Sequence, residues 1–394
     1  SRQQAFDATL RASACSMTFP SLWKRGFLFA AILARGRAPA SDDQCESDGS
    51  CVADVLTRSS RTRSVTAAII ANDDTRVHLS YLQPERVRSE LIRSKSTISN
   101  VVVIPLGEDS VALVVHSFDG KVAWYRGNPK AVGARTPLQS MGVVDDSITS
   151  VSCLGAGNGK TLALGHQDGS ASIWGFVDDR WISQAVVRSS HHDWEQVTRI
   201  AISPDGSVAV VCTADNVGVW RVVGRTAPKE LKHLHGGDSQ VSSAFVSDLD
   251  EGGYLVAVAF QSGSFQGWEV LPDSDNIEVL WQLPRRRMSR ITAITAGASG
   301  VVAADAEGGI SFWPLDSESL EISADQAPKW IVKPAGGFAA ASLAWVSAAK
   351  SFDPDESEQV VVAIGSAVLV LDAETGREVK RVAEPGSPSA LCTH

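Results

Sequence analysis

The most constraining feature of this sequence is a pattern of short apolar runs that repeats along most of the chain. From about residue 64, two apolar runs joined by a short turn are followed by a turn rich in Asp and Gly and by a third run that usually ends in Trp. Residues 148–174 and 197–220 show the pattern clearly. With Ser80 and Leu371 in place of Trp in the first and last copies, the third runs end 44, 50, 46, 48, 45 and 58 residues apart. The long last interval holds an acidic insertion at residues 351–358.

A repeat of this length, built from short strands and Asp-Gly turns, is typical of a propeller with four-stranded blades. No segment of helical periodicity and helix length interrupts it, which argues against a parallel α/β fold. The sequence therefore predicts an all-β fold, a β-propeller of seven four-stranded blades.

Two segments carry a resemblance to a known family. Residues 168–174, Asp-Gly-Ser-Ala-Ser-Ile-Trp, are similar to the Asp-Gly-Thr-x-x-x-Trp ending of WD40 repeats, and residues 202–206, Ile-Ser-Pro-Asp-Gly, are similar to the Phe-Ser-Pro-Asp-Gly turn of that family. The resemblance covers residues 64–394 and is weakest at both ends. The Trp-Asp dipeptide itself is missing, so the array resembles a divergent WD40 propeller, and a related seven- or eight-bladed type stays open. The resemblance implies a rigid ring whose loops bind other proteins.

The repeated Trp and Asp residues have a structural interpretation. In such blades the third-strand Trp fills the space between neighbouring sheets, and an Asp in the preceding turn accepts hydrogen bonds that fix the turn. Glycine supplies the turn conformation at Gly120, Gly169 and Gly206. The blade residues assigned in this way are Asp119, Trp124, Asp168, Trp174, Asp215, Trp220, Trp268 and Trp313.

The first 40 residues are interpreted as a leader outside the fold. They hold six Lys or Arg and one acid, with an apolar stretch after Lys24 and Arg25 and an Ala-Pro-Ala ending at Ala40 that fits a signal-peptidase site. An organelle transit peptide and a disordered leader are the alternatives. Localisation is expected to be secretory or endomembrane if residues 17–40 are a signal peptide, and otherwise cytoplasmic.

The remaining chain divides into a short connection and the propeller. Residues 41–63 are expected to be a linker or a first-blade strand, and residues 64–394 the propeller. For ring closure we expect residues 388–392 to form the innermost strand of the first blade beside residues 65–70. Residues 51–56 are the alternative for that place.

The net charge of the chain indicates which class of partner it binds. Residues 41–394 carry 30 Lys or Arg and 44 Asp or Glu, a net charge of −14. A body this acidic argues against nucleic-acid binding, which requires cations to neutralise phosphates. No apolar run reaches the length of a membrane span. Other proteins or peptides are therefore the expected partners, and no small-molecule ligand is expected.

Two segments are candidates for partner contacts. His191, His192 and Trp194 precede the first strand of a blade, where WD40 repeats often have Gly-His. A structural role is one interpretation, partner contact a second and metal binding a third. The basic cluster Arg285, Arg286 and Arg287 is either a solvated loop or a docking site for an acidic peptide or phosphate group.

No catalytic, metal or cofactor motif is present: neither a nucleophile elbow, nor HExxH, a Walker loop, CxxC or a zinc-ligand spacing. Cys153 and Cys212 lie in apolar runs and are expected to be buried thiols. The function predicted is a non-catalytic interaction scaffold, a subunit or adaptor of a larger complex, with no cofactor. Two alternatives are an exported quinoprotein-like enzyme, suggested by residues 370–377, and an endomembrane trafficking propeller.

Overall fold

A computed structural model describes the chain at residues 27–31, 51–58, 66–73, 76–81, 88–93, 96, 98–107, 110–127, 139–144, 150–157, 160–188, 195–222, 227–235, 239–249, 252–271, 274–283, 289–297, 299–316, 320–323, 325–334, 340–346, 358–364 and 367–383. Every regular element in these residues is a β-strand. No described helix has the length and apolar character needed to cross a membrane.

The strands are short and separated by turns. They are β1 Phe27–Ala31, β2 Cys51–Arg58, β3 Thr66–Asp73, β4 Arg76–Tyr81, β5 Arg88–Arg93, β6 Ile98–Gly107, β7 Ser110–Ser117, β8 Val122–Gly127, β9 Gln139–Val143, β10 Val151–Gly157, β11 Thr161–His166, β12 Ala171–Val177, β13 Arg180–Val187, β14 Arg199–Ile202, β15 Val208–Cys212, β16 Asn216–Arg221, β17 Lys229–His235, β18 Val241–Asp248, β19 Tyr254–Phe260, β20 Phe265–Val270, β21 Ile277–Leu283, β22 Ile291–Gly297, β23 Gly300–Asp305, β24 Ile310–Pro314, β25 Trp330–Val332, β26 Ala340–Val346, β27 Gln359–Ile364, β28 Ala367–Asp372 and β29 Glu378–Ala383.

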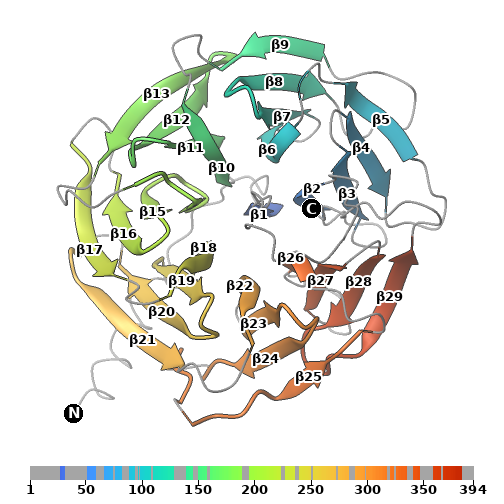
Figure 1. Cartoon of the computed structure of the whole chain (residues 1–394), viewed down its shortest axis with the longest axis vertical. Helices are drawn as coiled ribbons and strands as arrows, with labels where there is room; N and C mark the ends of the chain where they lie inside the picture. The colour runs from blue at the N-terminus through green and yellow to red at the C-terminus, as the bar shows by residue number, and fades with distance from the viewer. Residues whose placement is uncertain are drawn as a thin grey trace, which may run out of the picture.

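Consecutive strands pair antiparallel, so each sheet is a simple meander. Figure 1 shows the sheets arranged around a central axis, with the first strand of each sheet nearest the axis and the last at the rim. The prediction of an all-β propeller is confirmed. In the described residues, six sheets have four strands, β6–β9 through β26–β29, and the first sheet, β1–β5, has five rather than the predicted four.

The first sheet bears on the expectations for ring closure. Strand β2 pairs with β3 from Cys51↔Asn72 to Arg58↔Thr66, the place that the alternative expectation gave to residues 51–56. Strand β1, from the segment interpreted as a leader, pairs with β2. Residues 388–392, the other candidate for the closing strand, lie outside the described residues.

The core lies between the sheets. An apolar cluster joins each consecutive pair of sheets from β6–β9 to β26–β29. Trp268 and Trp313 are each 1% exposed and lie in two of these clusters. Since burying a large apolar side chain contributes about 1.5–3 kcal/mol, these clusters supply the main force that holds neighbouring sheets together.

A hydroxyl near the start of each of five successive first strands also fixes the inner part of the ring. Four of these hydroxyls lie at β-bulges in the first strand. Each donates a hydrogen bond to a carbonyl of the paired second strand: Ser99 Oγ to His116, Ser152 Oγ to Gly165, Thr198 Oγ1 to Cys212, Ser242 Oγ to Ala259 and Thr292 Oγ1 to Ala304, at 3.2, 3.1, 3.4, 3.1 and 3.3 Å. The extra residue of a bulge leaves ladder groups unpaired, and the hydroxyl satisfies one of them.

Candidate functional site

The two ends of the ring differ in the turns that they carry. One end, which we call the turn face, carries the turns between second and third strands at residues 118–121, 167–170, 213–215, 261–264 and 306–309. The opposite end, which we call the seam face, carries the connections between first and second strands and between third and fourth strands. Loops on a rigid scaffold are the usual place for recognition, so both faces are candidate surfaces.

Asp168 shows how a turn on the turn face is built. Its Oδ1 accepts hydrogen bonds from the Ser170 backbone N–H at 3.0 Å and from the Ser170 hydroxyl at 2.5 Å. These bonds, first that of the hydroxyl, lower the pKa of Asp168, so the carboxylate is charged at neutral pH. Gly169 has a φ of +79°, in the left-handed region that favours glycine. The Asp-Gly pair therefore fixes the turn before Trp174.

The other turns vary this arrangement. Asp119 accepts a hydrogen bond from Ser96 Oγ at 2.9 Å and from the Lys121 backbone at 3.4 Å, and Gly120 has a φ of +84°. In the turn between β15 and β16, Asp215 is exposed, and Thr213 Oγ1 accepts the hydrogen bond from the Asn216 backbone N–H at 3.1 Å. The equivalent turns further along carry Ser262 and Glu307.

The acids of three turns form ion pairs with bases of their own sheets. The pairs are Asp119 with Lys121, Asp168 with Arg188, and Glu307 with Lys333. Arg188 and Lys333 each directly follow the last strand of their sheet. All of these side chains are well exposed, so each pair adds little to stability.

Two histidines lie below the turn face. His166 Nε2 contacts Ser172 Oγ at 2.8 Å, and the same hydroxyl accepts a hydrogen bond from Trp174 Nε1 at 2.8 Å. His116 Nδ1 contacts Ser99 Oγ at 2.6 Å. Burial lowers the pKa of both histidines, that of His116 to about 4, so both are neutral at pH 7. Ser172 and Ser99 lie in the same sheets as these histidines, and His116 also lies near the backbone of Val151 in the next sheet, so both histidines have a structural role.

The predicted partner contacts, His191, His192, Trp194, Arg285, Arg286 and Arg287, lie outside the described residues. The described residues that flank them are at the turn face. Residues 189–194 separate the end of β13 from β14, and residues 284–288 separate the end of β21 from β22. These six residues stay predictions.

The Trp residues assigned to the blades are all buried. Trp124, Trp174, Trp220, Trp268 and Trp313 are 4, 7, 5, 1 and 1% exposed. Trp181 and Trp281, in fourth strands, are buried too, and Trp330 donates its Nε1–H to the Ala373 carbonyl of the next sheet at 3.0 Å. None of these eight indoles projects from the ring as a partner anchor, because packing between the sheets uses them.

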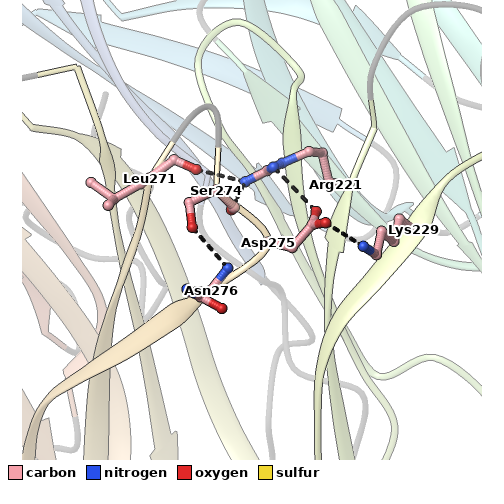
Figure 2. A network of polar contacts seen from close by, with 6 residues as sticks. All are labelled: Arg221, Lys229, Leu271, Ser274, Asp275 and Asn276. Carbon is pink, nitrogen blue, oxygen red and sulfur yellow. Dashed lines mark hydrogen bonds and ion pairs between the residues drawn. The ribbon is translucent and has the colours of Figure 1, made fainter.

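The seam face has a different chemistry, shown in Figure 2 for the β14–β17 and β18–β21 sheets. Arg221, at the end of β16, donates hydrogen bonds to the carbonyls of Leu271 and Ser274 and pairs with Asp275 at 3.5 Å. Lys229 of β17 pairs with the same carboxylate. The hydrogen bond from Lys229 lowers the pKa of Asp275. These contacts join one sheet to the next.

A second contact between the same sheets lies nearer the axis. Asp205 accepts hydrogen bonds from Tyr254 Oη at 2.8 Å, from Ser203 Oγ at 2.7 Å and from the Ser207 backbone at 3.0 Å. Ser207 Oγ donates to the Tyr254 oxygen at 2.8 Å. Asp205 thus closes its own turn and holds the start of β19 in the neighbouring sheet.

The described residues offer little reactive chemistry. Burial raises the pKa of the Cys153 thiol to about 12 and that of Cys212 further still, so neither is a thiolate at neutral pH. Among these residues no group of three or more His, Cys, Asp or Glu side chains is placed to hold a metal ion.

The segment that suggested a quinoprotein repeat forms the turn between β28 and β29. Asp372 Oδ1 accepts hydrogen bonds from the Thr375 backbone at 2.8 Å and from its hydroxyl at 2.6 Å. Gly376 has a φ of +69°. The motif residues that the structure describes therefore serve the turn.

Comparison with known proteins identifies the type of fold. No protein family and no curated protein sequence matches the chain. Among solved structures, Saccharomyces cerevisiae Sqt1 is similar at a TM-score of 0.56 and 15% identity over 83% of each chain. Chaetomium thermophilum Sqt1, bound to the N-terminus of ribosomal protein L10, gives 0.55 and 16% over 81% of this chain and 84% of that chain. A chain of the mitotic checkpoint complex gives 0.53 and 13% over 90% and 94%. At these identities the likeness shows the fold alone, which is a WD40-like β-propeller.

Proposed function

We propose that this chain is a non-catalytic protein-interaction scaffold, a subunit or adaptor of a larger complex, that binds its partner on the turn face. The observation that carries the proposal is that the polar side chains of the two faces have different roles. Side chains on the seam face hold neighbouring sheets together, while the acids of the turn face are paired within single sheets. The turn face is therefore a set of loops on a rigid ring whose acidic side chains are paired within single sheets, which is an arrangement suited to recognition.

Three further points support this assignment. The similar Sqt1 chain was solved with the N-terminus of ribosomal protein L10 bound, which shows that a ring of this shape can bind a peptide. The described cysteines are buried thiols, and the described histidines of the turn face are used in packing. The net charge of −14 over residues 41–394 favours protein partners over nucleic acid.

The test uses the predicted basic cluster. We expect the triple variant Arg285→Glu, Arg286→Glu and Arg287→Glu to lose partner proteins in a quantitative pull-down from the native source, with no change in melting temperature. A matched charge reversal on the seam face, Lys160→Glu with Arg180→Glu, is expected to keep them. Equal recovery of the same partners by the triple variant and the wild type would remove these arginines from the proposal, and no specific partner for the wild type would remove the scaffold function.

A further inference from the structure

The last strand of each sheet lies at the rim of the ring (Figure 1) and has one edge without a neighbouring strand in the described residues. Alternate residues of such an edge direct their backbone N–H and C=O groups away from the sheet. A strand of another chain can pair with these groups, so folded proteins protect their edges with charged side chains or keep the edge strand short. The rim strands therefore show where the ring is protected against pairing and where it is open to it.

Most rim strands in the described residues are protected. Strands β5, β17 and β29 each contain three Lys, Arg, Asp or Glu side chains, and β21 contains Glu278. Strand β25 has three residues, and β9 has five, one of them a glycine, which weakens a strand. Strand β13 has eight residues, and its residues 181–187 are all uncharged. A bulge does not distinguish β13, because β9, β17, β21 and β29 each contain one too.

Strand β13 is anchored at both ends and exposes apolar side chains between them. Trp181 packs in the cluster shared with the preceding sheet, and Val187 in the cluster shared with the following sheet. Between them Ile182 is 39% exposed and Val186 is 57% exposed. Removal of this apolar surface from water is favourable. The edge of β13 is therefore a fixed, uncharged strand on which a second strand gains both backbone pairing and apolar contact.

The charges beyond the two ends of β13 have opposite signs. At the seam-face end, residues 178–180 are Asp, Asp and Arg, with a net charge of −1, and at the turn-face end Arg188 follows the strand. The side chains of Asp179 and Arg188 are 67% and 65% exposed, and their pairs with Arg126 and Asp168 are surface pairs that contribute little. Asp178 is exposed and forms no ion pair with a described residue. A strand with an acidic end and a basic end is complementary to its own copy in antiparallel orientation.

We propose that β13 is the contact between two copies of this chain, which pair edge to edge and antiparallel about a two-fold axis near Gln184. This axis places the Ile182 end of one strand beside the Val186 end of the other. It also brings Asp178 and Asp179 of each copy beside Arg188 of the second copy, so the charge match occurs twice. The rim lies between the turn face and the seam face, so both faces of each ring stay open. The inference goes beyond the proposed scaffold function and does not depend on it.

The test is sedimentation velocity of the purified full chain at low salt, over a series of concentrations up to about 100 µM. We expect a reversible equilibrium between monomer and dimer that added salt shifts toward the monomer. Val186→Lys places two like charges in the contact, one from each copy, and is expected to raise the dimer Kd about tenfold or more. The matched controls are Val379→Lys on β29 and Val279→Lys on β21. These valines are 56% and 54% exposed, and the controls are expected to change the Kd less than about twofold.

A second variant tests the charge match without a new charge on the edge. Asp178→Asn with Asp179→Asn removes the acidic end of β13, and asparagine tolerates the φ values of +49° and +60° at these positions. We expect this variant to weaken the dimer about threefold and to remove most of its salt dependence. Unchanged melting temperatures of the variants show that each still folds.

Three results would overturn the proposal. The first is a wild-type chain that sediments as a monomer throughout the series, which would leave the β13 edge to a different protein. The second is a dimer that Val186→Lys does not weaken. The third is a dimer that Val379→Lys or Val279→Lys weakens as much as Val186→Lys, since the contact would then not be specific to β13.

Discussion

The two faces of the ring use ion pairs in opposite ways. On the seam face, four described pairs join consecutive sheets: Arg126 with Asp179, Arg221 and Lys229 with Asp275, and Lys329 with Glu374; Arg381 with Glu378 is a pair within β29. On the turn face, described pairs stay within one sheet: Lys121 with Asp119, Arg188 with Asp168, and Lys333 with Glu307. The same residue types therefore serve assembly at one end and local turn structure at the other.

This difference indicates which positions of the ring tolerate substitution. A substitution on the seam face removes a contact between two sheets and so affects the ring as a whole. A substitution on the turn face affects one exposed turn. Loops that bind a partner can vary in sequence at the turn face without loss of the fold, which is the property expected of a recognition surface.

Lowering the pH is expected to have the largest effect on stability. It acts on His116, a buried side chain of the turn face that also contacts the next sheet. His116 lies near the backbone of Val151 in the neighbouring sheet, and burial lowers its pKa from 6.5 to about 4, against the opposing effect of Asp119. Between these values the unfolded chain binds a proton that the folded chain does not, so stability falls as pH falls from about 6.5 to about 4 and then levels off, by about 3 kcal/mol in all.

The measurement is the free energy of unfolding in urea across that range for the wild type and for His116→Gln. The variant is expected to give a flatter curve, since other groups then supply the whole slope. Parallel curves for the two proteins would show that His116 does not carry the effect.

Asp205 and Asp168 allow a direct comparison of the faces. Asp205→Ala leaves Tyr254 Oη, Ser203 Oγ and the Ser207 backbone without their acceptor, and is expected to lower the free energy of unfolding by about 2 kcal/mol. Asp168→Ala, on the turn face, is expected to lower it by about 1 kcal/mol, because water replaces its exposed partners.

Tyr254→Phe provides the control for Asp205, because it removes only the contact between sheets. A loss of about 1 kcal/mol is expected for it. If Asp168→Ala proved as damaging as Asp205→Ala in chemical denaturation, the contrast between the faces would be wrong.

Substitution of Arg221 or Arg188 is expected to have the smallest effect on stability, and it tests the same difference between the two faces. The Arg221 side chain is 13% exposed and that of Arg188 is 65% exposed. Arg221→Ala removes hydrogen bonds to two carbonyls of the next sheet, so a loss of about 1–2 kcal/mol is expected. Arg188→Ala is expected to lose less than about 0.5 kcal/mol. Thermal unfolding of both variants checks the order, and a reversed order would contradict it.

The sequence was sufficient to predict the fold because the repeat is carried by many weak signals that agree. Trp124, Trp174, Trp220, Trp268 and Trp313 mark five third strands, and Gly120, Gly169 and Gly206 mark turns with φ values of +84°, +79° and +81°. A further signal was present but missed. The pairs Ile98-Ser99, Val151-Ser152, Val197-Thr198, Val241-Ser242 and Ile291-Thr292 mark five first strands, and each hydroxyl makes the same hydrogen bond.

Contacts between sheets were harder to predict. Arg126 and Asp179 are 53 residues apart, and Arg221 and Asp275 are 54 apart. Both separations are near the spacing of the repeat, so a partner one repeat further along could have been sought. The sequence does not say which exposed charge at that distance faces the seam, because this depends on the twist of each sheet.

The candidate site was predictable only in its general place. Loops before first strands were predicted as contacts, and these lie outside the described residues.

The contacts of the seam face have a mechanical consequence. In the described residues, polar side chains on that face tie β6–β9 to β10–β13, β14–β17 to β18–β21, and β22–β25 to β26–β29. The two intervening seams are joined by hydrogen bonds as well as by apolar clusters: Ser152 Oγ donates to the Val197 carbonyl, and the Ile294 backbone N–H donates to Ser243 Oγ. Each seam from β6–β9 to β26–β29 therefore combines non-directional apolar packing with directional polar contacts. Neighbouring sheets are thus held in a fixed relative orientation, so a partner meets loops whose relative positions are set before it binds.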